Sequence, residues 1–477
     1  MKGLRKQVRI AILICAVLLL SMCFFTGASA EEFLSFPEIT ETDCVWDENG
    51  NLINETAHDL NGAPAINRRG FFRAVYTWDS HGNMLSESYY GLNGEPVTTD
   101  KGYARAQYTY FTDVNNKSHI LTEDRYAEDG GRADISGEYS YRRDEWDQFG
   151  MLSSRYFNAN GELTRPSGGY AQILCERKEE DGQIIVIQRY QDADGSPLTG
   201  TEGGEVIVSA YSSQPFLLGE IEVEHLDYDM MIPVAVQGED SAYVYLLMSR
   251  RIYTADDHKV LGTGRWFHME NTYDSRANLL RTDYYGTEDE PILASSGYAS
   301  VVHVYDDRDR TIETDYLDVE GTLTKVLTGY AKVTFEYYEN DRIHYETYYG
   351  ADDQRTMTTY GYSMAEYEYY GDHFDWRVTY YDTVDEYTMC LEGFARQERI
   401  FQRYRPSGDE GGLWALYPDI VTEERYYGTD LQLIPVKAGH AGRINEVNGS
   451  GQILKTIYMD VNWQPVRNDE VQYASIV

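Results

Sequence analysis

The side chains best suited to bind a ligand are tyrosines that recur at corresponding points along the chain. They are Tyr90, Tyr285, Tyr349, Tyr381 and Tyr427. Each directly follows another tyrosine at the end of an alternating, strand-like stretch, so all five share one face if the stretches are strands. Aromatic rings between polar neighbours can stack on sugar rings or peptide surfaces. The simpler interpretation is a second packed face, and the five tyrosines remain candidate ligand-binding residues.

Carboxylates that could bind a metal ion are concentrated in turn-like segments. Residues 192–195 (Asp-Ala-Asp-Gly) and 306–309 (Asp-Asp-Arg-Asp) lack the remaining oxygen ligands of a known calcium loop, and Asp favours turns for its own reasons. The densest group, His225, Asp227 and Asp229, is explained more simply as a solvated acidic face. We therefore predict no metal site and no resident cofactor, with Ca²⁺ the one ion that the sequence leaves open.

Motifs that would indicate catalysis are missing from the sequence. It contains no His-Glu-x-x-His metalloprotease motif, no Gly-x-Ser-x-Gly nucleophile elbow and no phosphate-binding glycine loop. Paired carboxylates for glycoside hydrolysis carry no information in a chain with 79 acidic residues. We therefore predict a protein that is not an enzyme. The alternative is a divergent glycan-acting enzyme with its site in residues 205–263 or 405–420.

The elements that position these residues follow a repeat. A tyrosine is followed by a glycine thirteen positions later, and between Gly297 and Gly393 the whole pattern recurs every thirty-two residues. The pairs are Tyr89/Gly102, Tyr156/Gly169, Tyr190/Gly203, Tyr284/Gly297, Tyr316/Gly329, Tyr348/Gly361, Tyr380/Gly393 and Tyr426/Gly439. This regularity indicates a short supersecondary unit repeated along the chain, in which each unit packs on its neighbours.

Each repeat unit is predicted to contain three short strands and two turns. After the glycine, apolar and polar residues alternate, as in residues 104–110, with the period of a half-buried strand. A turn such as residues 78–83 follows, in which Asp79 bonds its own backbone and Gly82 accepts a positive φ. A lone hairpin is marginal in water, so neighbouring units must bury one another. We predict an all-β fold, an elongated array of stacked β-hairpins that forms a solenoid or an extended twisted sheet.

The tyrosine of the Tyr-to-Gly spacing is best explained by packing. Tyr89, Tyr316, Tyr348 and their counterparts hold one strand position in every copy of the pattern. An aromatic residue repeated in this way predicts a cross-strand ladder that holds unit to unit. The candidate ligand-binding tyrosines follow these residues directly and therefore point to the opposite face.

The repeat divides the chain into three parts after a targeting segment. Residues 31–204 form a first hairpin repeat arm, and residues 264–477 form a second arm with a loop insertion near 405–420. Residues 205–263 keep the β alternation but lose the Tyr-to-Gly spacing. They are either degenerate repeats or a break between the arms.

Residues 1–30 have the layout of a secretory signal peptide. A basic start from Lys2 to Arg9 precedes an apolar run over residues 10–25, and Ala28-Ser29-Ala30 offers a cleavage site. We expect cleavage, with an uncleaved N-terminal anchor as the alternative. No later stretch is apolar enough to span a bilayer. The chain after residue 30 is therefore expected outside the cytoplasm, secreted or associated with the cell surface.

The charge of the chain restricts its partners. The formal net charge is −38 at pH 7 and comes near −42 once the basic residues of the signal peptide are removed. Such a chain is repelled by nucleic acid and by an anionic lipid surface. The widely spaced Cys44, Cys175 and Cys390 of the mature chain do not form a disulfide framework.

The turn of residues 78–83 (Trp-Asp-Ser-His-Gly-Asn), followed by an apolar residue and a strand that ends in tyrosine, resembles the YD-type (Rhs-like) repeats of bacterial surface proteins. The resemblance covers most of residues 41–477, but this chain adds a third strand and a Gly-Tyr-Ala signature, and it lacks the toxin-like C-terminal domain of many Rhs proteins. A looser similarity, through Tyr-Tyr before a glycine turn, is to choline- and glucan-binding cell-wall repeats, whose Gly-Trp and aromatic cage are largely missing here. Both resemblances imply a bacterial, surface-exposed hairpin array used for attachment or binding.

The function that these observations favour is binding without catalysis. We expect a secreted or surface-held repeat protein that binds envelope polysaccharide or a surface protein. A structural spacer without a ligand is the alternative, and a divergent glycan-acting enzyme ranks third. The sequence does not determine the oligomeric state.

Overall fold

The computed structural model describes residues 40–59, 62–113, 117–147, 150–217, 231–234, 243–370, 375–403, 419–447, 453–466 and 475–476. The predicted signal peptide, the group from His225 to Asp229 and residues 405–418 of the predicted insertion lie outside these ranges. Within the described ranges, no helix is long and apolar enough to cross a membrane.

The structure describes 27 strands. The first are β1 (Thr40–Trp46), β2 (Leu52–Asp59), β3 (Arg73–Trp78), β4 (Met84–Tyr90), β5 (Arg105–Thr112), β6 (Ser118–Tyr126), β7 (Tyr141–Asp147), β8 (Gly150–Phe157), β9 (Gln172–Glu180), β10 (Gln183–Gln191), β11 (Val206–Tyr211), β12 (Phe216–Leu217) and β13 (Met231–Val234). The others are β14 (Tyr243–Tyr253), β15 (His268–Tyr273), β16 (Leu279–Tyr285), β17 (Ser300–Tyr305), β18 (Thr311–Leu317), β19 (Lys332–Tyr337), β20 (Ile343–Tyr349), β21 (Met364–Tyr370), β22 (Asp375–Tyr381), β23 (Arg396–Arg403), β24 (Asp419–Tyr427), β25 (Gly442–Val447), β26 (Ile453–Met459) and β27 (Ser475–Ile476).

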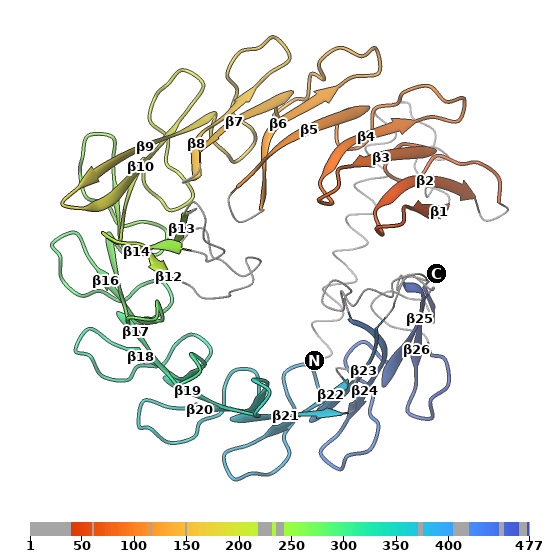
Figure 1. Ribbon diagram of the computed structural model, residues 1–477. Coiled ribbons are helices and arrows are strands. Elements are labelled where there is room, and N and C mark those ends of the chain that lie inside the picture. The colour runs from red at the N-terminus through yellow and green to blue at the C-terminus, as the bar shows by residue number, and fades with distance from the viewer. Residues whose placement is uncertain are drawn as a thin grey trace, which may run out of the picture. The chain divides into compact units, whose positions relative to one another are not determined.

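Outside β11–β14, strands pair with their neighbours in chain order, and the described residues contain no helix, which confirms the all-β prediction. Each antiparallel hairpin is joined to the next by a further antiparallel pairing, as β17–β18 is joined through β18–β19 to β19–β20. Figure 1 shows these strands following one another in colour order. Among the described residues, β1 pairs with β2 and β27 with β26, so the sheet is open. The chain is thus an array of antiparallel β-hairpins.

A repeat unit contains two strands and three turns, which corrects the predicted three strands and two turns. The segment after the second strand makes one isolated bridge to it, such as Tyr285 with Pro291 or Leu317 with Leu323. A third strand cannot form there because the closing turn starts three residues later, where the amide of Gly329 donates to the carbonyl of Val326. Gly329 has a φ of 94°, which glycine adopts without steric cost, and this explains the glycine of the repeat.

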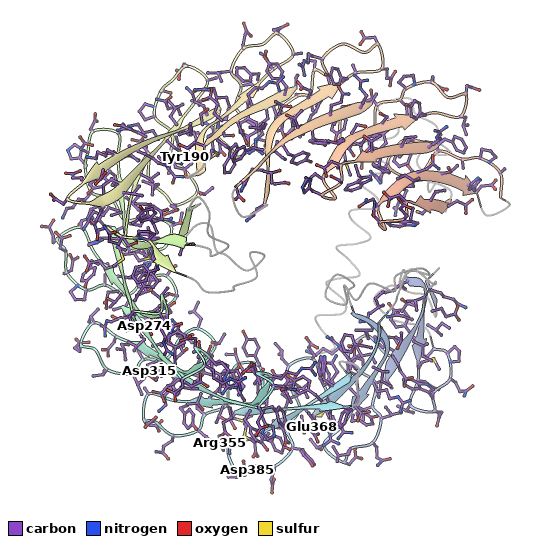
Figure 2. All side chains as sticks on the ribbon, viewed as in Figure 1. Tyr190, Asp274, Asp315, Arg355, Glu368 and Asp385 are labelled. Atoms are coloured by element: carbon purple, nitrogen blue, oxygen red, sulfur yellow. The ribbon has the colours of Figure 1, made fainter. Side chains whose placement is uncertain are left out.

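The turn between the two strands of a hairpin is closed by an aspartate side chain. Asp274, labelled in Figure 2, accepts hydrogen bonds from the amides of Arg276 at 2.8 Å and Asn278 at 2.9 Å. Ala277 takes the positive φ of 69° in this turn. The aspartates that open these turns therefore bond their own backbone, as the sequence predicts.

Residues 205–263 carry the strand pairing onward with an insertion inside one hairpin. β11 pairs with both β10 and β14, and β14 pairs in turn with β15. The small strands β12 and β13 pair with the first half of β14. In this hairpin, Ile252 occupies the ladder position and is fully buried. Arg265 follows thirteen residues later with a φ of 63° in place of the usual glycine.

The described residues divide into two compact units. The first contains the residues up to Tyr110 together with Ile120–Arg143 and Tyr156–Glu162. The second contains Phe111–His119, Asp144–Arg155 and the residues from Leu163 onward. This division differs from the predicted arms, whose boundaries at residues 204 and 263 stay a prediction.

Candidate ligand-binding surface

One face of the hairpins is occupied by packing between aromatic rings. In the second unit, successive ring centroids lie between 4.4 and 5.9 Å apart over an unbroken series. The series is Trp266, Tyr284, Tyr298, Tyr316, Tyr330, Tyr348, Tyr362, Tyr380, Phe394, Tyr426, His440 and Tyr458. The ladder tyrosines alternate with the aromatic residue that follows the closing glycine, so the predicted cross-strand ladder is present and contains two rings per repeat.

The ladder of the first unit contains a residue that the Tyr-to-Gly spacing does not reveal. Arg125 occupies the ladder position, and its guanidinium carbon lies 3.8 Å from the ring centroid of Tyr139 and 5.4 Å from that of Tyr103. A guanidinium is planar and stacks on aromatic rings, so arginine can replace tyrosine without interrupting the series.

Buried carboxylates lie on the same face, two residues before a ladder tyrosine. Glu87 is 3% exposed and accepts hydrogen bonds from Lys101 at 2.8 Å, Tyr108 at 3.0 Å and Tyr103 at 2.5 Å, as well as from Tyr89. Burial alone would raise the pKa of Glu87, but these hydrogen bonds outweigh it and hold the pKa below its ordinary value. Around Glu87, the ladder face is therefore occupied by packing and by hydrogen bonds within the protein.

The opposite face, here called the variable face, carries the five candidate tyrosines, all of them half-buried. Each lies directly across from a residue of the preceding strand in the hairpin. The pairs are Arg73 with Tyr90, His268 with Tyr285, Lys332 with Tyr349, Met364 with Tyr381 and Arg396 with Tyr427. Asp315, labelled in Figure 2, lies on the strand before Lys332 and pairs with it in register. The Lys332–Tyr349 pair therefore continues onto a third strand. The variable face thus combines rings with polar side chains.

The contacts of these tyrosines fall into two kinds. Tyr381 and Tyr427 use their hydroxyl groups within the protein, Tyr381 donating to Glu366 and Tyr427 donating to Glu398 at 2.6 Å. Tyr349 instead lies under a cation, since the Lys332 ammonium nitrogen is 4.9 Å from the centroid of its ring. Packing therefore accounts for part of the variable face, and the role of these residues in ligand binding stays a prediction.

Tyr90 and Tyr285 complete the set. The guanidinium carbon of Arg73 lies 5.7 Å from the ring centroid of Tyr90. The ring of Tyr285 lies beside the imidazole of His268, with a centroid separation of 5.3 Å and an interplanar angle of 32°. Of the five candidates, Tyr285 also lines a pocket.

This pocket is open to solvent and has a volume of about 430 Å³. Its lining is supplied by β14, β15, the end of β16 and the turns that follow β14 and β16. The lining residues are Arg251, Tyr253, Lys259, Phe267, His268, Glu270, Tyr285 and Asp289. Within this lining, Arg251, His268 and Tyr285 are consecutive cross-strand partners.

His268 is the unusual group of the pocket. Its side chain is 7% exposed, and its Nε2 makes no hydrogen bond, although Glu270 Oε1 lies 3.3 Å away outside hydrogen-bond geometry. Burial, followed by the positive charge of Arg251, lowers the pKa of His268 to about 4. The imidazole is therefore neutral at neutral pH, and a buried polar nitrogen without a partner is costly unless a ligand or water bonds it.

The charged residues of the pocket are of both signs. Lys259 forms an ion pair with Asp289 at 2.7 Å, and the hydrogen bond from Lys259 lowers the pKa of Asp289. The ammonium nitrogen of Lys259 also lies 4.9 Å from the ring centroid of Phe267. Arg251 donates to the hydroxyl of Ser249 at 3.3 Å. The pocket therefore offers hydrogen-bond donors and acceptors side by side next to aromatic rings.

Among the pocket residues, the sequence singled out Tyr285 alone. A usable signal was present, because the repeats place glycine, an aromatic residue and then a small residue before the first strand, as in Gly329-Tyr330-Ala331. At the pocket these positions hold Arg265, Trp266 and Phe267. The hairpin of β3 and β4 shares the bulky third residue, Phe72, but keeps the glycine, Gly70.

The aspartate-rich turns are bonded internally. Asp306 accepts hydrogen bonds from the amides of Arg308 and Arg310, and the hydrogen bond from the Arg310 side chain lowers the pKa of Asp306 to about 2. Over the described ranges, no group of three or more histidine, cysteine or acidic side chains could hold a metal ion.

Comparisons with known proteins give remote structural likenesses. No family model and no curated protein matches the sequence. A crystal structure of TcdB2-TccC3-Cdc42 is 12% identical, with a TM-score of 0.20 over 87% of this chain and 21% of that chain. A Photorhabdus luminescens Tc holotoxin pore with a TccC3 mutation is also 12% identical, with a TM-score of 0.10 over 90% of this chain and 28% of that chain. This chain thus spans under a third of the length of either, and TM-scores this low support no conclusion about it.

Proposed function

We propose that the chain is a divergent YD-type repeat protein outside the cytoplasm that binds envelope polysaccharide through its variable face, without catalysis. The supporting observation is the cross-strand pairing of an aromatic ring with a cation or an imidazole on that face, at Arg73–Tyr90, His268–Tyr285 and Lys332–Tyr349. Sugar-binding surfaces combine ring faces for the apolar side of a pyranose with planar or charged groups for its hydroxyls.

The protonation state of Asp289 in the pocket favours binding over catalysis. A glycosidase needs a carboxyl group that holds a proton near neutral pH. Asp289 is ion paired with Lys259 and has a lowered pKa, so it remains charged. The side chain of Glu270, the other pocket carboxylate, is 50% exposed to solvent.

Retention of the mature chain on purified cell walls and on insoluble polysaccharides tests the proposal. The double variant Tyr90→Ala/Tyr349→Ala should lose most of this retention. Leu317→Ala serves as the matched control, because Leu317 holds the same strand position without an aromatic ring. Equal retention of the double variant and the wild type, or no retention of the wild type on any wall or polymer, would overturn the proposal.

A structural spacer is the second candidate, and one observation favours it. The closing turns of successive repeats bond one another, with the amide of Thr359 donating to the carbonyl of Thr328 at 2.9 Å and that of Leu391 donating to Tyr360 at 2.6 Å. Turns linked in series stiffen an array against bending between repeats. A folded mature chain that is retained on no wall fraction would favour this candidate.

A further inference from the structure

The pocket at Tyr285 lies in a hairpin that departs from the repeat at two positions, Arg265 and Phe267. Arg265 holds a left-handed conformation that glycine holds in the neighbouring repeats, and Phe267 fills the position of a buried alanine or serine such as Ala299, Ala331 or Ser363. Departures from a locally consistent pattern tend to mark functional sites, since they lower stability unless something is gained. Phe267 is 1% exposed and supports the ring of Tyr253 at a centroid distance of 5.2 Å.

We propose that this pocket binds one neutral pyranose residue of a polysaccharide, an inference that rests on the proposed function and specifies its ligand. The pocket volume of about 430 Å³ exceeds that of a single sugar ring and leaves an open side for a chain to continue. The half-buried rings of Tyr253 and Tyr285 supply flat apolar surfaces to its lining. The apolar face of a pyranose packs on such rings.

The polar lining favours a hydroxyl-rich ligand over an anion. A sugar hydroxyl both donates and accepts hydrogen bonds, and the pocket offers Arg251 and Lys259 as donors beside Glu270 and Asp289 as acceptors. A carboxylate ligand would meet the same two acidic side chains at close range. It would also approach a chain with a formal net charge of −38, which repels anions.

His268 supplies the specific contact. Its Nε2 is buried, lacks a hydrogen bond and belongs to a neutral imidazole that lines the pocket. When the side chains over it shift, this nitrogen donates to or accepts from a ligand hydroxyl, depending on the tautomer, which satisfies the group. Arg251 and Tyr285 lie on either side of His268 in cross-strand register. A pyranose ring that packs on Tyr285 therefore has its hydroxyls within reach of His268 and Arg251.

Isothermal titration of the mature chain with cellohexaose, maltohexaose, mannohexaose, chitohexaose and hexagalacturonate tests this inference. At least one neutral hexasaccharide should bind, and hexagalacturonate should bind at least tenfold more weakly. Tyr285→Ala and Arg251→Met should each weaken the neutral sugar at least tenfold. Tyr285→Phe keeps the ring and should bind within threefold of the wild type. Leu317→Ala, outside the pocket and without an aromatic ring at the corresponding strand position, should bind within twofold, and the urea midpoints of all variants report on folding.

The inference is overturned if no neutral hexasaccharide binds, if hexagalacturonate binds more tightly, or if Tyr285→Ala binds like the wild type. These outcomes are separate from failure of the proposed function. Wall retention that depends on Tyr90 and Tyr349, without binding of a hexasaccharide, rejects the pocket and keeps the variable face. Hexasaccharide binding that Tyr285→Ala abolishes, with no wall retention, keeps the pocket and rejects the wall as its target.

Discussion

Replacing Glu87 by glutamine removes a buried charge from beneath the aromatic ladder of the first unit while keeping the size of the side chain. The carboxylate of Glu87 accepts hydrogen bonds from Lys101 and from the hydroxyl groups of Tyr89, Tyr103 and Tyr108. A glutamine keeps one acceptor oxygen but presents an amide group to the remaining donors, so some of these hydrogen bonds cannot form.

The expected loss follows from the number of bonds that glutamine cannot make. A hydrogen bond to a charged group contributes about 1.5–3 kcal/mol, and we expect two of them to be lost. Lys101 is 41% exposed, so its ammonium group can turn to water and the larger values do not apply. Glu87→Gln should therefore lower the free energy of unfolding by about 3 kcal/mol at neutral pH.

The effect should also depend on pH in one direction. Because the folded-state pKa of Glu87 is depressed, its contribution is fully present above the ordinary glutamate pKa of about 4.3 and is lost as the pH falls through the folded value. The difference between wild type and Glu87→Gln should therefore be constant near pH 7 and should shrink under acid conditions.

Urea unfolding followed by tryptophan fluorescence measures this difference. Trp78 reports on the region because it packs against the hydrophobic cluster that contains Tyr89 and Tyr103. Hydrogen exchange of the β4 and β5 amides reports whether the loss is local to this repeat. Glu48→Gln is the matched control, because it removes the same charge from an exposed turn. A loss below about 0.5 kcal/mol, the level of an ordinary surface substitution, or a difference that widens in acid, would refute the reasoning.

Three further predictions concern stability in urea. Arg265→Gly should stabilise the protein by about 1 kcal/mol, because a φ of 63° is strained for arginine, and an unchanged midpoint would contradict this strain. Ala331→Leu should destabilise by about 1–3 kcal/mol, since Ala331 is 0% exposed; tolerance would show that the site is loosely packed. Thr282→Val should cost about 1–3 kcal/mol, because buried Asn271 loses its 2.8 Å hydrogen bond, whereas exposed Thr272→Val should not.

The ladder shows how far a one-dimensional pattern can predict packing. A tyrosine at a fixed distance from a glycine is visible in the sequence because the strand period and the closing turn are both local. The spacing does not reveal the ladder positions held by Ala57, Arg125 and Ile252. The backbone amide of each nevertheless donates a hydrogen bond to a carbonyl of the following repeat, as the amide of Tyr89 does. The backbone hydrogen bond to the following repeat, not residue type, defines the position.

The sequence by itself determined the β alternation, the Tyr-to-Gly repeat, the aspartate turns and the face that each tyrosine occupies. These features depend on residues a few positions apart and on the conformational preferences of glycine and aspartate. Tertiary structure alone decided that the third segment of each repeat is a single bridge and that Glu87 is buried. It also decided that Arg251, His268 and Tyr285 share one pocket. Those outcomes follow from cross-strand register, which brings together residues from three strands and two turns that no local spacing relates.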